Sequence, residues 1–350
     1  MEKQKIYYLD NASGAQMSNE AYREMIDAYG SLYANPECIY KAGRDASDAI
    51  LRAKEKVAKA IGATADEIIL TSGQAESNNL AIKGIARANR KKGNHIITSV
   101  IEDESVLDSC RALEKEGFVV TYIPVDENGS IKYSEVVKAI GPNTILITIS
   151  VANAEVGTIQ PIRAIAELAK ANEVVFHTDA THAIGMIDLS VKEIGVDALS
   201  LSAHLFGGPM GVGALYVKKG TAIQKLIDGK TSEDAFRAGE LDVPAIVAMG
   251  KAIEEVTENV EERSKYLRSI RRYFLKKASE AIHNIELNGH ASQRLANHAS
   301  LSFEGADGEA VAVLLDKEGI FVSTSASAGR VSQKPSYVLL AMGKELEQAE

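Results

Sequence analysis

The chain has 350 residues, of which 45% are apolar and 25% charged, a composition typical of a globular protein with a large core. Its net charge of −9 argues against a nucleic-acid-binding surface, which needs clustered Lys and Arg. No apolar run reaches the roughly 18 residues of a membrane span, and the first residues lack the apolar stretch of a signal peptide. Cys38 and Cys110 cannot make a disulfide framework, so we expect a cytoplasmic protein.

The chain opens with a strand-like run at residues 6–10 and two helical patterns at 19–33 and 46–61. Short apolar strands then alternate with amphipathic helices. The predicted strands are 68–71, 95–100, 119–123, 144–150, 174–178, 198–202 and 211–217. The predicted helices are 76–90, 105–115, 133–140 and 162–171. Apolar strands in alternation with helices indicate an α/β fold with a mostly parallel sheet that is covered on both faces.

After about Val243 the pattern changes to a long charged helical stretch at 246–281. Short strands at 285–287, 299–303 and 320–322 and a helix at 308–315 follow, which is an α+β layout. At about 150 residues per domain, the length fits two domains. We predict a large domain of residues 15–250 and a small domain of residues 1–14 and 251–350, packed together without a Pro- or Ser-rich linker.

In such open sheets, ligands bind outside the carboxyl ends of the strands. Five segments directly follow predicted strands: Ser72-Gly-Gln-Ala-Glu76, Glu102-Asp103, Ala152-Asn-Ala-Glu155, Asp179-Ala-Thr-His182 and Ser202-Ala-His-Leu205. The first of them runs into a helix, and the free N–H groups of a helix N-terminus favour an anion such as phosphate.

The sequence resembles the cysteine desulfurases of the class V aminotransferase group, which are fold-type I enzymes that depend on pyridoxal phosphate (PLP). The resemblance spans nearly the whole chain and is carried by YLDNASG, TSGQAESNNLAIKGIA, HIITSVIEDESVLDSCR, NAEVGTIQPI, FHTDATHAIG, DALSLSAHLFGGPMGVGALYV, FRAGELDVPAIVAMGKA and PSYVLLAMG. It implies a fold-type I PLP-transferase-like architecture: a large domain with a mostly parallel seven-stranded sheet, a smaller α+β domain, and a homodimer.

Two residues that the resemblance makes essential are missing. The family reads Ser-x-His-Lys, with the lysine that holds PLP covalently, where this chain has Leu205. The nucleophilic cysteine of the family, which takes up the substrate sulfur, aligns with Ala328. We therefore predict no catalytic residues and no covalently bound cofactor.

Four further family positions are changed. The phosphate-binding Thr matches Ala75, the ring-stacking His matches Asp103, the Asn near the pyridine hydroxyl matches Ala154, and a Gln matches His182. The resemblance leaves Asp179 as the partner of the pyridinium nitrogen and Ser202 and His204 as phosphate contacts. The candidate cofactor-binding residues are Gly73, Gln74, Asp103, Asp179, His182, Ser202, His204 and Arg237. Six replacements in six segments indicate a degenerate paralogue.

Three hypotheses follow for the function. The first is a noncatalytic or regulatory partner in sulfur transfer or iron–sulfur cluster assembly, as a homodimer or in a heteromer with an active desulfurase or a scaffold protein. The second is a repurposed pocket in which Asp103, Asp179, His182 and His204 hold a divalent metal or a small anion. The third is a PLP-dependent enzyme completed by another chain. Noncovalent PLP and a relocated sulfur acceptor at Cys38 stay open as alternatives.

Overall fold

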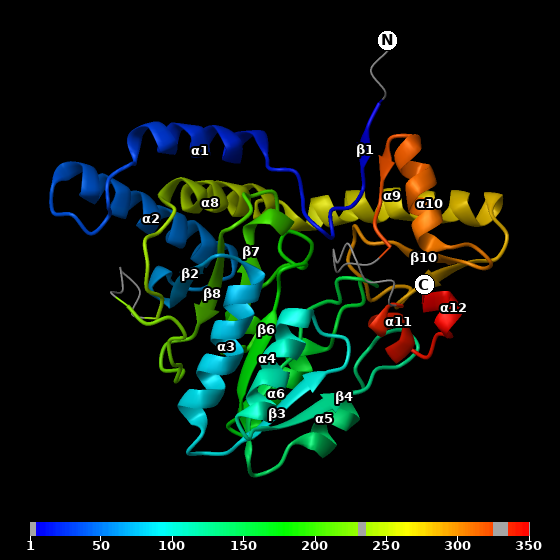
Figure 1. The fold of residues 1–350 in the computed structure, drawn as a ribbon, viewed down its shortest axis with the longest axis horizontal. Coiled ribbons are helices and arrows are strands. Elements are labelled where there is room, and N and C mark those ends of the chain that lie inside the picture. Colours follow the sequence, from blue (N-terminus) through cyan, green and yellow to red (C-terminus); the bar gives the residue numbers. More distant parts are fainter. Residues whose placement is uncertain (1–4, 230–235, 325–334, 350) are drawn as a thin grey trace.

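A seven-stranded sheet forms the centre of the computed structural model, which describes residues 5–229, 236–324 and 335–349 (Figure 1). Its strand order is β2-β8-β7-β6-β5-β3-β4. The bounds are β2 Ile68–Thr71, β3 His95–Ser99, β4 Val119–Ile123, β5 Thr144–Thr148, β6 Val175–Asp179, β7 Ala198–Ser202 and β8 Gly213–Val217. Only β8 runs antiparallel to its neighbours, so the predicted mostly parallel sheet is confirmed.

Helices cover both faces of this sheet, as the alternation of strands and helices predicted. The helices of this part of the chain are α1 Asn19–Ser31, which packs against another helix, and α2 Lys41–Ala60, α3 Gln74–Asn89, α4 Glu104–Lys115, α5 Tyr133–Ala139, α6 Ile162–Ala171 and α7 Val191–Ile194. Two short 3₁₀ turns, η1 Ala65–Glu67 and η2 Ala203–Leu205, join strands to their neighbours.

The side chains of each strand divide between two apolar cores, one on each face. In β2, Ile68 and Leu70 enter the core that contains α2, α6 and α8 (Val243–Thr257), whereas Ile69 enters the core under α3 and α4. Successive side chains of a strand point to opposite faces, so a fully apolar strand fills both cores. This division explains why the strands have apolar residues at both odd and even positions.

The predicted helical stretch at 246–281 is wrong in one respect, because it is two helices. The first, α8 Val243–Thr257, buries most of its residues and packs against α1 and α2. The second, α9 Val260–Ala281, is charged and buries only Ser264 among its residues. Asn259 separates the two helices with a non-helical backbone (φ −139°, ψ 55°).

The remaining elements form two small sheets and three helices. Strand β1 Tyr7–Tyr8 pairs in parallel with β11 Ile320–Phe321, and β9 Ile285–Asn288 pairs antiparallel with β10 Ser300–Phe303. The helices are α10 Gly308–Lys317, α11 Tyr337–Ala341 and α12 Leu346–Ala349. The division into two domains at residue 250 stays a prediction, and that residue lies inside α8.

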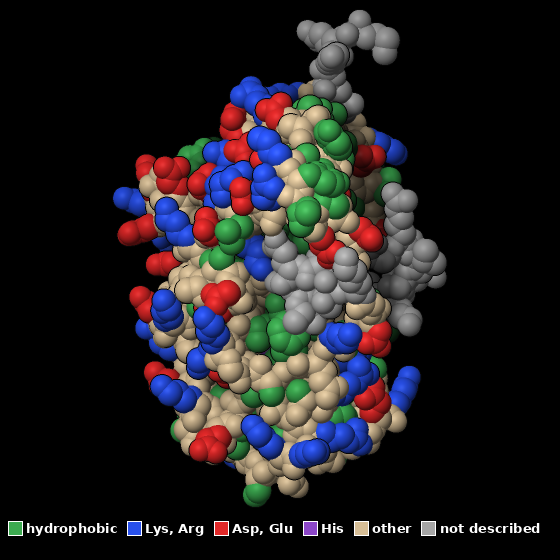
Figure 2. Space-filling view, turned by 90° about the vertical axis from the view of Figure 1, so that its left-hand side faces the viewer, with side chains coloured by type: hydrophobic (Ala, Val, Ile, Leu, Met, Phe, Trp, Pro, Cys, Tyr) green, Lys and Arg blue, Asp and Glu red, His purple; other side chains and the backbone are tan. Residues whose placement is uncertain are grey.

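One face of α1 carries apolar side chains that no other described element covers. Tyr22, Ile26, Tyr29 and Tyr33 are exposed and recur three and four positions apart, which places them on one side of the helix and its end. Ile39 and Tyr40 continue the exposed set into the α1–α2 connection. Figure 2 looks onto this end of the molecule, where hydrophobic side chains lie between groups of charged ones. We call these six residues the α1 stripe.

In the described ranges, no helix is both long and apolar enough to cross a membrane.

The close packing of α8 on α2 depends on Gly250. A Cβ atom at this buried position would lie 2.9 Å from the Cα of Ala53. We predict that Gly250→Val lowers the free energy of unfolding by about 1–3 kcal/mol, because the helices must move apart. Urea denaturation measures the change. Gly30→Ala in α1 is the control, since nothing lies within 4 Å of the added atom. Equal stability of both variants would contradict the packing argument.

Candidate functional site

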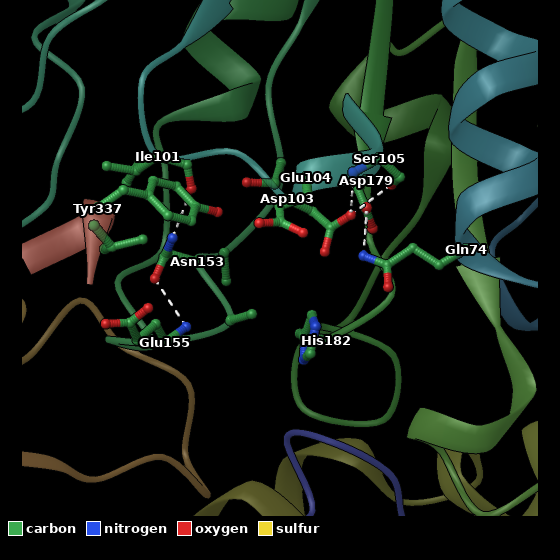
Figure 3. A pocket seen from close by; sticks show the side chains of 14 residues that line it. Gln74, Ile101, Asp103, Glu104, Ser105, Asn153, Glu155, Asp179, His182 and Tyr337 are labelled. Carbon is green, nitrogen blue, oxygen red and sulfur yellow. Dashed lines mark hydrogen bonds between the residues drawn. The ribbon is translucent and has the colours of Figure 1, made fainter. Parts of the chain in front are cut away.

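A cavity of about 430 Å³ lies at the carboxyl ends of β3, β5 and β6 (Figure 3). Four of the predicted cofactor-binding residues line it: Gln74, Asp103, Asp179 and His182. The other four, Gly73, Ser202, His204 and Arg237, are not among its lining residues. The predicted residues therefore divide into two groups at this edge of the sheet, one that lines the cavity and one that lies outside its wall.

Asp179, the last residue of β6, is almost fully buried and its carboxylate is fully hydrogen-bonded. Gln74 Nε2 and Asn78 Nδ2 donate to its Oδ2 at 2.9 and 2.7 Å. The backbone N–H and the hydroxyl of Thr181 donate to its Oδ1 at 2.9 and 2.6 Å. A carboxylate has about four acceptor sites, so little capacity is left for a ligand.

Asp103 is the N-cap of α4, and its position is fixed by that helix. Its Oδ1 accepts from the backbone N–H of Ser105 at 2.8 Å and from the Ser105 hydroxyl. Ser105 Oγ in turn accepts from Asn78 Nδ2 at 2.9 Å, so a chain of hydrogen bonds joins Asp103 to Asp179. Burial raises the pKa of the Asp103 carboxyl, and the Asp179 carboxylate raises it further.

His182 faces the cavity and makes no hydrogen bond with any described residue (Figure 3). Burial lowers its pKa, although the Asp179 and Asp103 carboxylates oppose this change. The imidazole is therefore neutral at neutral pH and adds no positive charge to the wall.

Gly73, Ser202 and His204 meet at the start of α3, next to the cavity. Gly73 precedes the helix with a φ of 137°, and a Cβ there would lie 3.2 Å from Ser202 Oγ. Ser202 Oγ and His204 Nδ1 lie 2.8 Å apart, within hydrogen-bonding distance. Arg237 Nε donates to Glu76 Oε1 at 3.0 Å in the first turn of this helix. A helix therefore begins where the sequence predicted one, with the nearby arginine paired to a carboxylate, and the anion site stays a prediction.

Leu205 ends the short turn η2 after β7 and is half-buried. Its side chain is not among those that line the cavity. Ala328 lies outside the described residues. Ala154 lines the cavity, and its carbonyl accepts a hydrogen bond from His298.

The structure does not support the predicted metal site. No group of three or more His, Cys, Asp or Glu side chains is arranged to hold a metal ion within the described ranges. The carboxylate oxygens of Asp179 already accept hydrogen bonds from four protein donors. His204 lies outside the cavity wall, within hydrogen-bonding distance of Ser202.

Three acidic or phenolic residues at the site were not predicted. Glu102 is buried behind the cavity, where Ser99 Oγ and the backbone N–H of Ser150 donate to its carboxylate. Glu155 lines the wall and accepts from Ser336 Oγ. Tyr337 donates to the Glu102 carbonyl at 2.7 Å. Glu102 and Glu155 lie in segments that directly follow strands, and this position could have identified them as candidate site residues. Nothing in the sequence places Tyr337 at the site.

The described residues do not fit PLP, whose phosphate and phenolate are negatively charged. Four carboxylates line the cavity, those of Asp103, Glu104, Glu155 and Asp179, and no Lys or Arg of the described residues lines it. Asp179, the partner that the resemblance implies for the pyridinium nitrogen, already has four donors. Like charges around an anionic ring oppose its binding.

Comparison with known proteins gives a consistent result. The model of the aminotransferase class-V family matches residues 7–346. The cysteine desulfurase IscS of Dictyoglomus turgidum is 45% identical over 342 residues, which cover 98% of this chain and 87% of that protein. IscS of Methanosarcina thermophila is 45% identical over 97% of this chain and 84% of that protein. A solved NifS-like protein superposes with a TM-score of 0.92 at 34% identity, covering 99% of this chain and 92% of the other.

The buried Glu102 predicts a pH-dependent stability. Burial raises its pKa from 4.5 to about 7. Between pH 4.5 and about 7, the folded state therefore keeps a proton on Glu102 that the unfolded state releases. The stability that this proton gives is lost as the pH rises through 7. We expect Glu102→Gln to be more stable than the wild type by up to about 3 kcal/mol at pH 8, and equally stable near pH 4.5.

Denaturant unfolding at the two pH values measures this difference. Glutamine retains an acceptor for Ser150 and a polar partner for Ser99, so the variant preserves the local contacts. Glu104→Gln, at an exposed neighbouring position, is the control. A stability difference that does not change with pH would show that Glu102 is ionised in the folded protein.

Proposed function

We propose that this chain, which belongs to the aminotransferase class-V family, is a cysteine desulfurase-like protein without desulfurase activity. It has Leu205 where the resemblance places the PLP-binding lysine. It acts as a noncatalytic or regulatory partner in sulfur transfer or iron–sulfur cluster assembly. The observation that carries the proposal is Leu205, since leucine has no amine to hold the cofactor.

The charge of the cavity supports the same conclusion. PLP supplies the electron sink for this family's chemistry when it is bound. The described wall offers no Lys that could replace the missing one, and its carboxylates oppose an anionic cofactor. Several separate features of the site thus disfavour the ancestral reaction.

The α1 stripe supports the partner role. Its side chains are largely exposed, with Tyr33 at 82% and Ile39 at 89%, and they follow one another along α1 and the connection to α2. Exposed apolar patches of this kind mark protein–protein contacts. We infer that a second copy of this chain, or an active desulfurase of the same fold, covers this surface.

Both cysteines of the chain are free thiols, and Cys110 is buried within α4. Burial raises the pKa of the Cys110 thiol to about 12, so it is an unreactive core residue. Free thiols without disulfides support the cytoplasmic location that we propose.

The first test is a desulfurase assay on the purified protein with cysteine, PLP and a reductant. We expect no sulfide above the protein-free background. Leu205→Lys should also give none, because Asp103 and the other acidic wall residues still oppose the cofactor. An active desulfurase serves as the positive control. Sulfide release by the wild-type protein would overturn the proposal.

The second test concerns the α1 stripe. Ile26→Arg combined with Tyr33→Arg should weaken self-association or association with an active desulfurase about tenfold or more, because it places charge in an apolar contact. Sedimentation of the protein alone measures self-association, and sedimentation of its mixture with an active desulfurase measures the association of the two proteins. Tyr266→Arg, at an exposed position of α9, is the matched control. A wild-type protein that stays monomeric in both experiments would contradict the partner role.

A further inference from the structure

Helix α9 carries an excess of positive charge in a chain that is negative overall. Its 22 residues include seven Lys or Arg and three Glu, hence a net charge of +4, whereas the whole chain has a net charge of −9. Arg268, Arg271 and Arg272 form no ion pair with another described residue. This positive charge is therefore not neutralised within the described ranges, and such a surface attracts an anionic partner.

The three arginines in the middle of α9 repel one another. Arg271 turns toward the body of the protein, where its Nη1 donates to the carbonyl of Leu295. Burial lowers the pKa of Arg271, and the guanidinium groups of Arg268 and Arg272 lower it further. An anionic group placed beside Arg268 and Arg272 would offset this repulsion.

An apolar groove of about 280 Å³ lies between α9 and the small sheet of β9 and β10. Most of its lining side chains are aliphatic. The helix and the two strands contribute Leu275, Lys276, Ser279, Ile285, Leu287 and Leu301. The groove is smaller than a typical small-molecule pocket, and it suits an apolar side chain of a bound polypeptide.

The groove and the cations lie on the same side of α9. Arg268, Arg272 and Lys276 are four positions apart, and Leu275 and Ser279 follow Arg272 and Lys276 by three positions. Residues at these intervals are neighbours on one side of a helix. The three cations are exposed. A polypeptide along this side can therefore place an apolar side chain in the groove and carboxylates against Arg268 and Arg272.

We propose that this side of α9 binds an acidic segment of another protein that carries an apolar anchor residue. Charge complementarity selects the acidic side chains, and the groove selects the anchor. A flat anionic membrane does not fill a concave groove, and nucleic acid has no aliphatic side chain to place there. The inference goes beyond the proposed function, because it requires neither the loss of desulfurase activity nor the α1 stripe.

The test is fluorescence anisotropy of the full-length protein with a labelled peptide of repeated Asp-Glu-Leu units. We expect saturable binding that weakens as salt is added. A peptide with Gly in place of Leu should bind about tenfold more weakly, because it has the same charge and no anchor. Phosphatidylglycerol vesicles should not sediment the protein. Absence of saturable binding, equal binding of the Gly peptide, or capture by the vesicles would overturn the proposal.

Two variants locate the binding surface. Arg268→Gln combined with Arg272→Gln should weaken binding of the Leu peptide about tenfold or more. Ser279→Phe should do the same, because the ring occupies the groove. All three positions are exposed, and the thermal unfolding midpoint checks that the fold is intact.

The matched control is Arg263→Gln combined with Lys277→Gln. It removes the same charge from α9 at positions five before Arg268 and five after Arg272, which lie on another side of the helix. This variant should bind the peptide like the wild type. An equal loss in both double variants, or unchanged affinity in the variants of the binding surface, would overturn the assignment.

Peptide binding is measured without cysteine or PLP, so its result is independent of the desulfurase assay. Sulfide release together with peptide binding would overturn only the proposed function, and absence of both would overturn only the α9 site.

Discussion

The buried carboxylate of Asp179 constrains the arrangement of the whole site. A charge in the interior must be matched by hydrogen bonds, and this one receives donors from α3 and from the turn after β6. Asn78 extends the contact through Ser105 to the N-cap of α4. One strand end and two helices are thereby held in fixed positions, and the cavity is the space that remains between them and the loop after β5. The same scaffold can therefore persist while the side chains that face the space change.

This separation of scaffold and wall allows a chain that shares 45% identity with an IscS protein to differ from it in chemistry, as we propose. The apolar strands and their two cores determine where the strand ends lie. The residues after those ends decide the charge of the cavity, and they contribute little to the cores. Replacing an imidazole by the Asp103 carboxylate changes what the cavity can bind without changing the sheet.

Much of the fold could be predicted from the sequence, because short, mainly apolar strands that alternate with amphipathic helices have few alternative arrangements. Strands β2, β4 and β7 have the predicted bounds, and the segments after strands do supply the cavity wall. The break at Asn259 was missed because helical periodicity continues on both sides of it. Tyr337 was missed because its approach to Glu102 depends on tertiary packing across 235 positions. Residue types alone also do not show that donors such as Gln74 already occupy a carboxylate, as they do at Asp179.

The contacts of α11 have a consequence for how the chain is made. Ser336 and Tyr337 reach Glu155 and Glu102 across 181 and 235 positions, and Val338 forms part of the wall. A ribosome produces residues in order, so the sheet and the acidic strand-end segments emerge long before the segment that completes the enclosure. The cavity can exist only after residues 336–338 have been synthesised. A nascent chain that has not reached them has the acidic strand-end segments without the enclosure.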